Sequence, residues 1–330
     1  MATISLCMIA KDEEQSIGRA INSVKPFVDE VIVVDTGSAD NTAGVARQLG
    51  ASVYHYKWVD DFSKARNFSI SKASSDWILV LDADEELLEG DASRLAKLAD
   101  GNCDAYMLIQ KNFSNTQAFG FVPEKKRGFA GFYPSFIIRM FKTGKGIQFE
   151  GMVHETVDDS LSKWKANVVL VPELPVYHYP ELKGAEYFRQ KQLKYAELME
   201  KNLGSFKNKA KAYADIGLVH YRFKADYAKA AEYFRKSLEL KPDAPLVLND
   251  LAAAYVQLGD IKKAGETFAQ SMQLKPSAST LFNIGLVHQK MGDNEAAAIS
   301  FEESARLGHP RAKELLERAA ALRAANGKKG

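Results

Sequence analysis

The feature that most constrains the fold is a period of 33 or 34 residues in the second half of the chain. Small, aromatic and proline residues recur there at fixed offsets: Ala230, Ala264 and Ala297; Phe234, Phe268 and Phe301; Pro242 and Pro276. A period of this length is typical of arrays whose units bury their apolar faces against their neighbours. Alanine lets paired helices approach, an aromatic ring fills the groove, and proline ends a helix. The pattern therefore predicts stacked helix–turn–helix units.

These segments resemble the tetratricopeptide repeat, which has the same length and the same residue types at these offsets. The resemblance places repeats at about 211–244, 245–278 and 279–310, with a capping helix over 311–326. In the first repeat, the turn "RFKAD" carries one more residue than the other two turns. An irregular helical bundle is the alternative.

The first half of the chain alternates short apolar runs with helical patterns. We expect buried strands over 3–10, 30–36, 51–58 and 76–84, helices over 13–27, 38–51 and 61–74, and later strands over 104–113 and 135–141. Strand and helix in alternation indicate a mostly parallel sheet, and the later strands add an antiparallel part. The segment 120–134 is rich in glycine, proline and aromatic residues, which predicts a mobile loop.

Length and composition limit the class of protein. A chain of 330 residues exceeds most single cores, so we expect an α/β domain over 1–182 and an all-α domain over 183–330. The net charge of +2 gives no indication of a nucleic-acid partner. No apolar run is long enough for a membrane span, and the N-terminus does not read as a signal peptide. Two cysteines fit a reducing compartment, which predicts a cytoplasmic protein.

Acidic residues follow several of the predicted strands. The run "WILVLDADEEL" ends in Asp82, Asp84, Glu85 and Glu86, Asp35 follows the second strand, and "KDEE" follows the first. Carboxyl ends of parallel strands meet at one edge of an α/β sheet, where ligands bind. A divalent cation is a simple means of holding several carboxylates together, and Mg²⁺ or Mn²⁺ prefers a few carboxylates with phosphates and water. The acids therefore predict a metal site that neutralises a diphosphate.

Other nucleotide-binding classes lack their motifs in this sequence. Neither GxxxxGK[ST] nor GxGxxG is present, which argues against a P-loop kinase and a dinucleotide dehydrogenase. A nucleotidyltransferase also uses paired acids around a metal, but it usually has a glycine-rich, basic phosphate loop after its first strand. The sequence there is "AKDEEQS".

Four motifs resemble, in order, the nucleotide-binding motifs of family-2 inverting glycosyltransferases with the GT-A fold. They are "SLCMIAKDEE", "VDEVIVVDTGSADNT", "WVDDFSKARNFSI" and "DWILVLDADEEL", and the resemblance covers about residues 1 to 180. It implies a metal-dependent transfer from a nucleoside-diphosphate sugar, with uridine favoured because the family most often uses it. Members of this group also carry tetratricopeptide tails.

The resemblance assigns donor contacts residue by residue. Asp35 corresponds to the aspartate that contacts the base or ribose, and Ala10 and Glu13 lie where the first loop borders the base. The family more often has Asn before that Glu, where this chain has Asp12. Arg66 is placed to approach the donor. The Asp-x-Asp (DXD) motif is Asp82, Ala83 and Asp84, with Asp82 and Ala83 facing the nucleotide-sugar and Asp84 as the direct ligand of Mn²⁺ or Mg²⁺.

Two further segments supply the candidate general base and the candidate histidine ligand. An inverting transfer needs a general base near the nucleophile, and Glu155 in "FEGMVHETV" matches the family's acidic position. A C-terminal histidine completes the metal site in part of the GT-A group, which favours His178 in "LPVYHYP" as a ligand. His154 is the competing histidine, and its alternative role is a hydrogen bond near the acceptor or the diphosphate.

Alternatives from other classes remain at this point. The protein is a transferase whose repeats recruit a polypeptide or glycan acceptor, or a catalytically inactive adaptor whose repeats are the working surface. The repeats also offer a surface for a homodimer. The donor base and sugar, the acceptor, and the choice between Mn²⁺ and Mg²⁺ are open.

Overall fold

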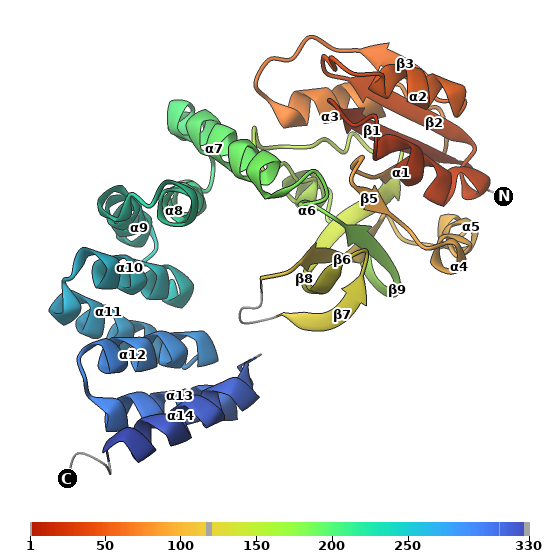
Figure 1. Cartoon of the computed structure of the whole chain (residues 1–330). Helices are drawn as coiled ribbons and strands as arrows, with labels where there is room; N and C mark the ends of the chain where they lie inside the picture. Colours follow the sequence, from red (N-terminus) through yellow and green to blue (C-terminus); the bar gives the residue numbers. More distant parts are fainter. Residues whose placement is uncertain (1, 117–120, 310, 327–330) are drawn as a thin grey trace. The chain divides into compact units, whose positions relative to one another are not determined.

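The computed structural model describes residues 2–116, 121–309 and 311–326 (Figure 1). The chain divides into two compact units, Met1–Ser114 with Pro123–Gly184, and Asn115–Val122 with Ala185–Gly330. The first unit is built on a mixed sheet with helices, and the second consists of consecutive helices. This confirms the predicted fold class of an α/β domain followed by an all-α repeat domain.

The described part of the first unit contains a nine-stranded sheet in the order β3-β2-β1-β4-β8-β6-β9-β5, with β7 paired to β8. Its strands are β1 Ile4–Ala10, β2 Glu30–Asp35, β3 Ser52–His55, β4 Trp77–Val80, β5 Glu85–Glu86, β6 Ala105–Ser114, β7 Val122–Lys126, β8 Phe129–Lys142 and β9 Val168–His178. Strands β3, β2, β1 and β4 are parallel, whereas β8 runs antiparallel to both β4 and β6. The carboxyl ends of β1, β2 and β4 therefore meet at one edge.

Helices cover both faces of this sheet, which explains why its central strands are apolar throughout. The helices of the unit are α1 Ile17–Val24, α2 Thr42–Gln48, α3 Phe62–Ile70, α4 Glu89–Ala92, α5 Leu95–Ala99 and α6 Asp158–Lys163, with a 3₁₀ turn at Lys25–Phe27. Leu6 and Met8 of β1 point into the core that α1 and α2 cover. Cys7 between them points to the opposite core, which includes Leu161 of α6.

Our prediction of a mobile loop over 120–134 is wrong for the described residues of this segment. Residues 122–126 and 129–142 are strands β7 and β8, joined by a two-residue turn at Arg127 and Gly128. Both turn residues have positive φ, 49° and 84°, as a type I′ hairpin turn requires. The glycines and prolines are tolerated because the long pairing of β8 with β6 holds the strand. Residues 117–120 lie outside the described part.

The second unit is a stack of helices in chain order (Figure 1). The helices are α7 Ala185–Lys201, α8 Lys209–Val219, α9 Tyr227–Leu240, α10 Pro245–Leu258, α11 Ile261–Leu274, α12 Ala278–Lys290, α13 Asn294–Arg306 and α14 Ala312–Asn326, with a 3₁₀ turn at Leu203–Ser205. The alanines and phenylalanines that define the period are buried, as close packing of paired helices requires. Within the described residues, no helix combines the length and apolar character that crossing a membrane requires.

The extra residue in the first repeat has a visible consequence. Helix α8 continues into a π-helical turn, His220–Lys224, and ends at Ala225 in the left-handed conformation with φ 51°. A π-helical turn is the usual way in which one inserted residue fits into an α-helix. The insertion therefore changes a turn and leaves the pairing of α8 with α9 intact.

Candidate active site

Two of the predicted donor contacts lie side by side at the ends of β1 and β2. Ala10 and Asp35 are register partners, and both are buried. One Asp35 oxygen, Oδ1, accepts hydrogen bonds from the backbone of Gly37 (3.2 Å) and from the backbone (2.9 Å) and hydroxyl (2.7 Å) of Ser38. The other oxygen lies 3.3 Å from Nδ1 of His55. The turn after β2 thus holds the Asp35 carboxylate in place at the sheet edge.

Arginines neutralise the first of the acids that follow β4. Asp82 accepts hydrogen bonds from Arg66 of α3 and, at 3.0 Å, from Nη2 of Arg139 of β8. Burial by itself would raise the pKa of the Asp82 carboxyl, but the charges of Arg66 and Arg139 outweigh it and hold the pKa well below its usual range. Asp82 is therefore an anion at neutral pH, without any metal ion.

The next two acids are also matched by arginines. Glu85 is fully buried and accepts from Arg139, while Glu86 accepts from Arg127 at 3.1 and 3.0 Å and lies 3.2 Å from Nε of Arg19. No cation is therefore needed to balance the charges of these two acids. Arginine side chains from other elements supply the positive charge, which a local reading of "DADEEL" could not show.

Asp84 has a histidine among its partners. Its Oδ2 lies 3.5 Å from Nε2 of His178 at the end of β9, and its carbonyl accepts from the Tyr179 backbone at 3.1 Å. Burial would lower the pKa of His178, but the carboxylate of Asp84 outweighs it, and the pKa lies above its usual range. The structure therefore brings together the two residues that the sequence analysis paired as metal ligands.

This pair fits a divalent cation that also binds substrate phosphates. Among the described residues, no group of three or more His, Cys, Asp and Glu side chains is placed to hold a metal. Mg²⁺ and Mn²⁺ sites for nucleotides, however, commonly use one or two protein ligands and complete their coordination with phosphates and water. A carboxylate and an imidazole that face each other, each partly exposed, match that donor set.

Arg66 links the acidic run to the predicted base. Its Nε donates to Oε1 of Glu155 at 2.7 Å, while Nη2 donates to Asp82. Burial would lower the pKa of the Arg66 guanidinium, but these two carboxylates raise it above its usual value. Arg66 is 5% exposed, and its third nitrogen, Nη1, has no hydrogen-bond partner among the described atoms. Arg66 thus orients Glu155 relative to Asp82.

The loop that carries Glu155 is anchored to α3. Asn67 of α3 donates to the Phe149 carbonyl at 3.0 Å and accepts from the Phe149 backbone at 2.8 Å. Glu150 and Thr156 exchange two backbone hydrogen bonds, of 2.8 and 3.0 Å, which close the loop around Glu155. The helix that provides Arg66 therefore also fixes the segment that provides its partner.

Glu13, at the end of β1, contacts the last residues of the first unit. Lys183 places Nζ 2.7 Å from Oε1 of Glu13 and donates to the carbonyl of Asp12. Burial raises the pKa of Glu13, and the nearby charge of Asp84 adds to this, although Lys183 and Ser16 oppose it. Glu13 therefore lies within electrostatic reach of the Asp84 carboxylate.

Two of the remaining candidates lie elsewhere. The Ala83 side chain is buried in the core beside Leu81 and Leu87, so only its backbone can face a ligand. His154 is exposed, with a left-handed backbone at φ 57°. His178, as described above, lies against Asp84.

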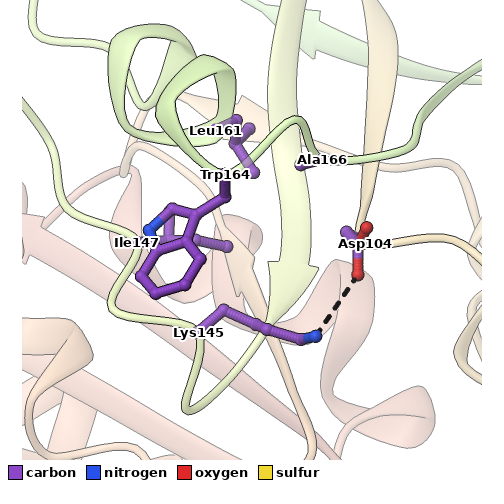
Figure 2. A pocket seen from close by; sticks show the side chains of 6 residues that line it. All are labelled: Asp104, Lys145, Ile147, Leu161, Trp164 and Ala166. Atoms are coloured by element: carbon purple, nitrogen blue, oxygen red, sulfur yellow. Dashed lines mark ion pairs between the residues drawn. The ribbon is translucent and has the colours of Figure 1, made fainter.

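A shallow pocket in the first unit is separate from these residues. Asp104, Lys145, Ile147, Leu161, Trp164 and Ala166 line it, and Lys145 forms an ion pair of 3.8 Å with Asp104 (Figure 2). Its volume is about 50 Å³. This is room for one or two water molecules and far below the several hundred Å³ that a small-molecule site occupies. The pocket is therefore no site for a nucleotide-sugar.

Sequence reasoning missed residues that complete the charged cluster. Arg139 and Lys183 are the main examples, and neither belongs to a recognisable motif. Arg139 had a usable signal, because "SFIIRMF" has an arginine inside an otherwise apolar strand. A buried charge is rare unless it is paired. Lys183 had none, since a lysine after a strand is most often exposed.

Comparison with known proteins finds a family match in each of the two units. Residues 5–152 match the model of Glycosyl transferase family 2, and residues 224–279 and 278–307 match tetratricopeptide repeat models. A TPR repeat-containing protein from Synechococcus elongatus is 38% identical over 187 residues, which cover 54% of this chain and 43% of that protein. An uncharacterized glycosyltransferase from Rickettsia felis is 44% identical over 111 residues, which cover 33% of this chain and 39% of that protein.

The chain thus spans about two fifths of the length of these curated relatives. Among solved structures, a crystal structure of glucosyl-3-phosphoglycerate synthase from Mycobacterium tuberculosis with Mn²⁺, uridine diphosphate and phosphoglyceric acid is 28% identical. Its match covers 34% of this chain and 43% of that one, with a TM-score of 0.28. Together, the matches identify a Glycosyl transferase family 2 domain in the N-terminal part of the chain and tetratricopeptide repeats in its C-terminal part.

Proposed function

We propose that the protein transfers a sugar, with inversion, from a nucleoside-diphosphate sugar to an acceptor. The observation that carries this is the contact of Asp84, one of the four acids after β4, with His178. Arginines neutralise Asp82, Glu85 and Glu86, whereas Asp84 faces His178. The protein therefore supplies one carboxylate and one imidazole for a cation at the sheet edge where the donor is expected.

In this proposal, Asp84 and His178 hold Mn²⁺ or Mg²⁺. When bound, the cation balances the negative charge of the diphosphate as it departs. Ala10, Glu13 and Asp35 border the base and ribose, and uridine is the favoured base because of the family resemblance. Asp82 and the backbone of Ala83 face the sugar or ribose, and Arg66 holds Asp82 toward them.

Glu155 acts as the general base. The acceptor nucleophile attacks the anomeric carbon, its proton passes to Glu155, and the bond from that carbon to the diphosphate oxygen breaks. The nucleoside diphosphate leaves with the bonding electron pair. The ion pair with Arg66 fixes the direction in which the Glu155 carboxylate points, and positioning of this kind contributes a large part of the rate in group transfer.

The acceptor is a polypeptide or a glycan, and the repeats provide the surface that recruits it. Stacked helix pairs form extended concave surfaces that suit a long, flexible acceptor. A homodimer through the repeats is the alternative use of the same helices. An inactive adaptor is the alternative for the whole chain.

A donor panel tests the proposal without knowledge of the acceptor. The full chain is incubated with UDP-, GDP- and dTDP-linked sugars and Mn²⁺, and release of the nucleoside diphosphate to water is measured. We expect slow hydrolysis of one donor, abolished by a chelator. Asp84→Asn should lower it at least 100-fold, since it removes a metal ligand while preserving side-chain shape.

The matched control is Glu89→Gln, which removes an exposed acid from the end of the same acidic segment. It should leave hydrolysis unchanged. Wild-type protein that neither binds nor hydrolyses any donor would favour the adaptor, and full activity in Asp84→Asn would remove Asp84 from the site.

A further inference from the structure

His178 has different partners on its two ring nitrogens. Nδ1 lies 2.7 Å from Oδ1 of Asn112, and Nε2 lies 3.5 Å from Oδ2 of Asp84. Asn112 of β6 and His178 of β9 are register partners in parallel strands, so the sheet itself fixes the contact. Which nitrogen carries the proton in a neutral imidazole depends on the hydrogen bond that the other nitrogen makes.

The orientation of the Asn112 amide decides this. Its Nδ2 donates to the carbonyl of Tyr133 at 3.1 Å and to the hydroxyl of Ser135 at 2.9 Å. A carbonyl can only accept, so the NH₂ group of Asn112 must face Tyr133. Oδ1 then faces His178 and can only accept. The neutral ring must therefore carry its proton on Nδ1, which leaves a lone pair on Nε2.

The hydrogen bonds on the other side of Asn112, which lead through Ser135 and Gln110 to Glu85, require the same orientation of the Asn112 amide. The Ser135 hydroxyl donates to Oε1 of Gln110 at 2.9 Å, and Nε2 of Gln110 donates to Oε1 of Glu85 at 2.5 Å. Glu85 is fully buried and also accepts from Arg139 and, at 2.8 Å, from the Asp82 backbone. As a carboxylate it accepts only, so every bond in the chain must run toward it.

We propose that this chain of hydrogen bonds, from Glu85 through Gln110 and Ser135 to Asn112, is a positioning device for His178. It presents the Nε2 lone pair on the side of Asp84, ready to bind a divalent cation. Asn112 is the positioning residue, since it is the member of this chain of hydrogen bonds that touches the imidazole. The inference rests on the proposed function, and it deepens it by assigning the ligating atom of His178 to Nε2 and the positioning of the ring to Asn112.

This chain of hydrogen bonds explains why polar side chains lie on the neighbouring strands β6, β8 and β9. A ligating histidine needs its other nitrogen bonded to an acceptor, and loss of that acceptor typically lowers metal affinity 10- to 100-fold. Without Asn112, the buried Nδ1–H would lose its partner, and the ring would favour a proton on Nε2, directed at Asp84. That proton would have to leave before a cation could bind.

Nitrogen NMR of protein labelled with ¹⁵N-histidine tests the tautomer without metal or turnover. The chain has six histidines, and His178→Gln identifies the signal of interest. At alkaline pH, where the ring is neutral, we expect Nδ1 to carry the proton in the wild type. Asn112→Leu should move it to Nε2, and Asn112→Asp, which keeps an acceptor, should return it to Nδ1. A wild-type ring with its proton on Nε2 overturns the proposal, even if the leucine variant fails to fold.

Manganese binding provides the second readout. Free Mn²⁺ is followed by electron paramagnetic resonance in the presence of uridine diphosphate. We expect Asn112→Leu to weaken Mn²⁺ 10- to 100-fold and Asn112→Asp to restore the affinity. Equal affinity in Asn112→Leu and wild type overturns the proposal. Failure of the proposed function is distinct: the wild type then binds no Mn²⁺ and hydrolyses no donor, while the tautomer still shows whether Asn112 orients the ring.

Discussion

The two units of the chain place their charges differently. In the first unit, Arg66 and Arg139 lie inside the domain and neutralise carboxylates that follow β4. In the second unit, the last core cluster between paired helices consists of alanine, phenylalanine and leucine, and the ion pairs of Arg323 on α14 lie at the surface. Buried ion pairs cost desolvation that their attraction barely repays, whereas alanine and phenylalanine gain from burial alone.

This difference teaches where function constrains each unit. A repeat is held together mainly by the shape and burial of small and aromatic side chains, so its sequence shows a period. An active site needs charges held at fixed positions. In the first unit, buried arginines and carboxylates lose hydration in order to meet this need. Three substitutions test this comparison, from the largest expected effect to the smallest. The three tryptophans, Trp58, Trp77 and Trp164, all lie in the first unit, so their fluorescence reports its unfolding separately.

Arg139→Met should have the largest effect on stability. It leaves the fully buried Glu85 carboxylate without its arginine and Asp82 with one arginine instead of two. Removal of one partner from a buried ion pair typically costs about 3–5 kcal/mol. Urea unfolding followed by tryptophan fluorescence measures the loss.

The control for this prediction is Arg323→Met. Arg323 lies 3.0 Å from Glu295 and also pairs with Glu302, but it is exposed, so water replaces the lost contacts. Its unfolding midpoint, followed by circular dichroism at 222 nm, should barely change. Equal losses in the two variants would contradict the contrast between buried and exposed pairs.

Gly285→Ala should destabilise the second unit by about 1–3 kcal/mol, as overpacking of a core does. A Cβ at this position in α12 would lie 2.6 Å from two ring atoms of Phe301 in α13, closer than packed atoms approach. Unfolding is followed by circular dichroism at 222 nm, and the tryptophan transition of the first unit should not change.

Gly265→Ala is the matched control in α11, where a Cβ would meet open space. Alanine is a better helix former than glycine, so this variant should gain about 0.5–1 kcal/mol. The account of close helix pairing fails if both glycine variants change stability in the same direction.

Asp250→Asn should give the smallest change, and one that depends on pH. Asp250 lies on α10, and burial raises its pKa to about 6, although Arg222 opposes this. Between about pH 4 and 6 the folded state keeps a proton that the unfolded chain has lost, so wild-type stability falls as pH rises through this window. Above pH 6 the loss is complete, and it amounts to about 1 kcal/mol for a side chain that water still partly reaches.

The variant should therefore match the wild type near pH 4 and exceed it by about 1 kcal/mol at pH 7. Thermal unfolding of both proteins at several pH values gives the difference. A difference that is constant with pH would show that Asp250 does not titrate in this window.

The regular parts of the structure were predictable from sequence because short-range physics determines them. The period of the repeats predicts paired helices, since Phe234 and its equivalents must be buried for the units to stack. The apolar runs that become β1, β2 and β4 predict strands covered on both faces. Asp84 and His178, 94 residues apart, were paired only through the family resemblance, and the structure brings them together.

The features that could not be predicted depend on contacts between residues that lie far apart in the sequence. The first part of β8, residues 129–134, reads as a loop locally, and only its pairing with β6 makes it a strand. Arg139 meets Asp82 across 57 residues, and Asn112 meets His178 across 66, so no local pattern records either contact. A carboxylate in a sequence also does not show whether an arginine or a cation will neutralise it.

The central claim is that Asp84 and His178 hold a cation that binds the donor's diphosphate. The most direct measurement is calorimetric titration of uridine diphosphate into the full chain, with Mn²⁺ or with a chelator, for wild type and Asp84→Asn. We predict that Mn²⁺ tightens binding to the wild type at least 10-fold and has no such effect on Asp84→Asn. Equal affinity with and without Mn²⁺ in the wild type, or an unchanged Mn²⁺ effect in Asp84→Asn, would contradict the account.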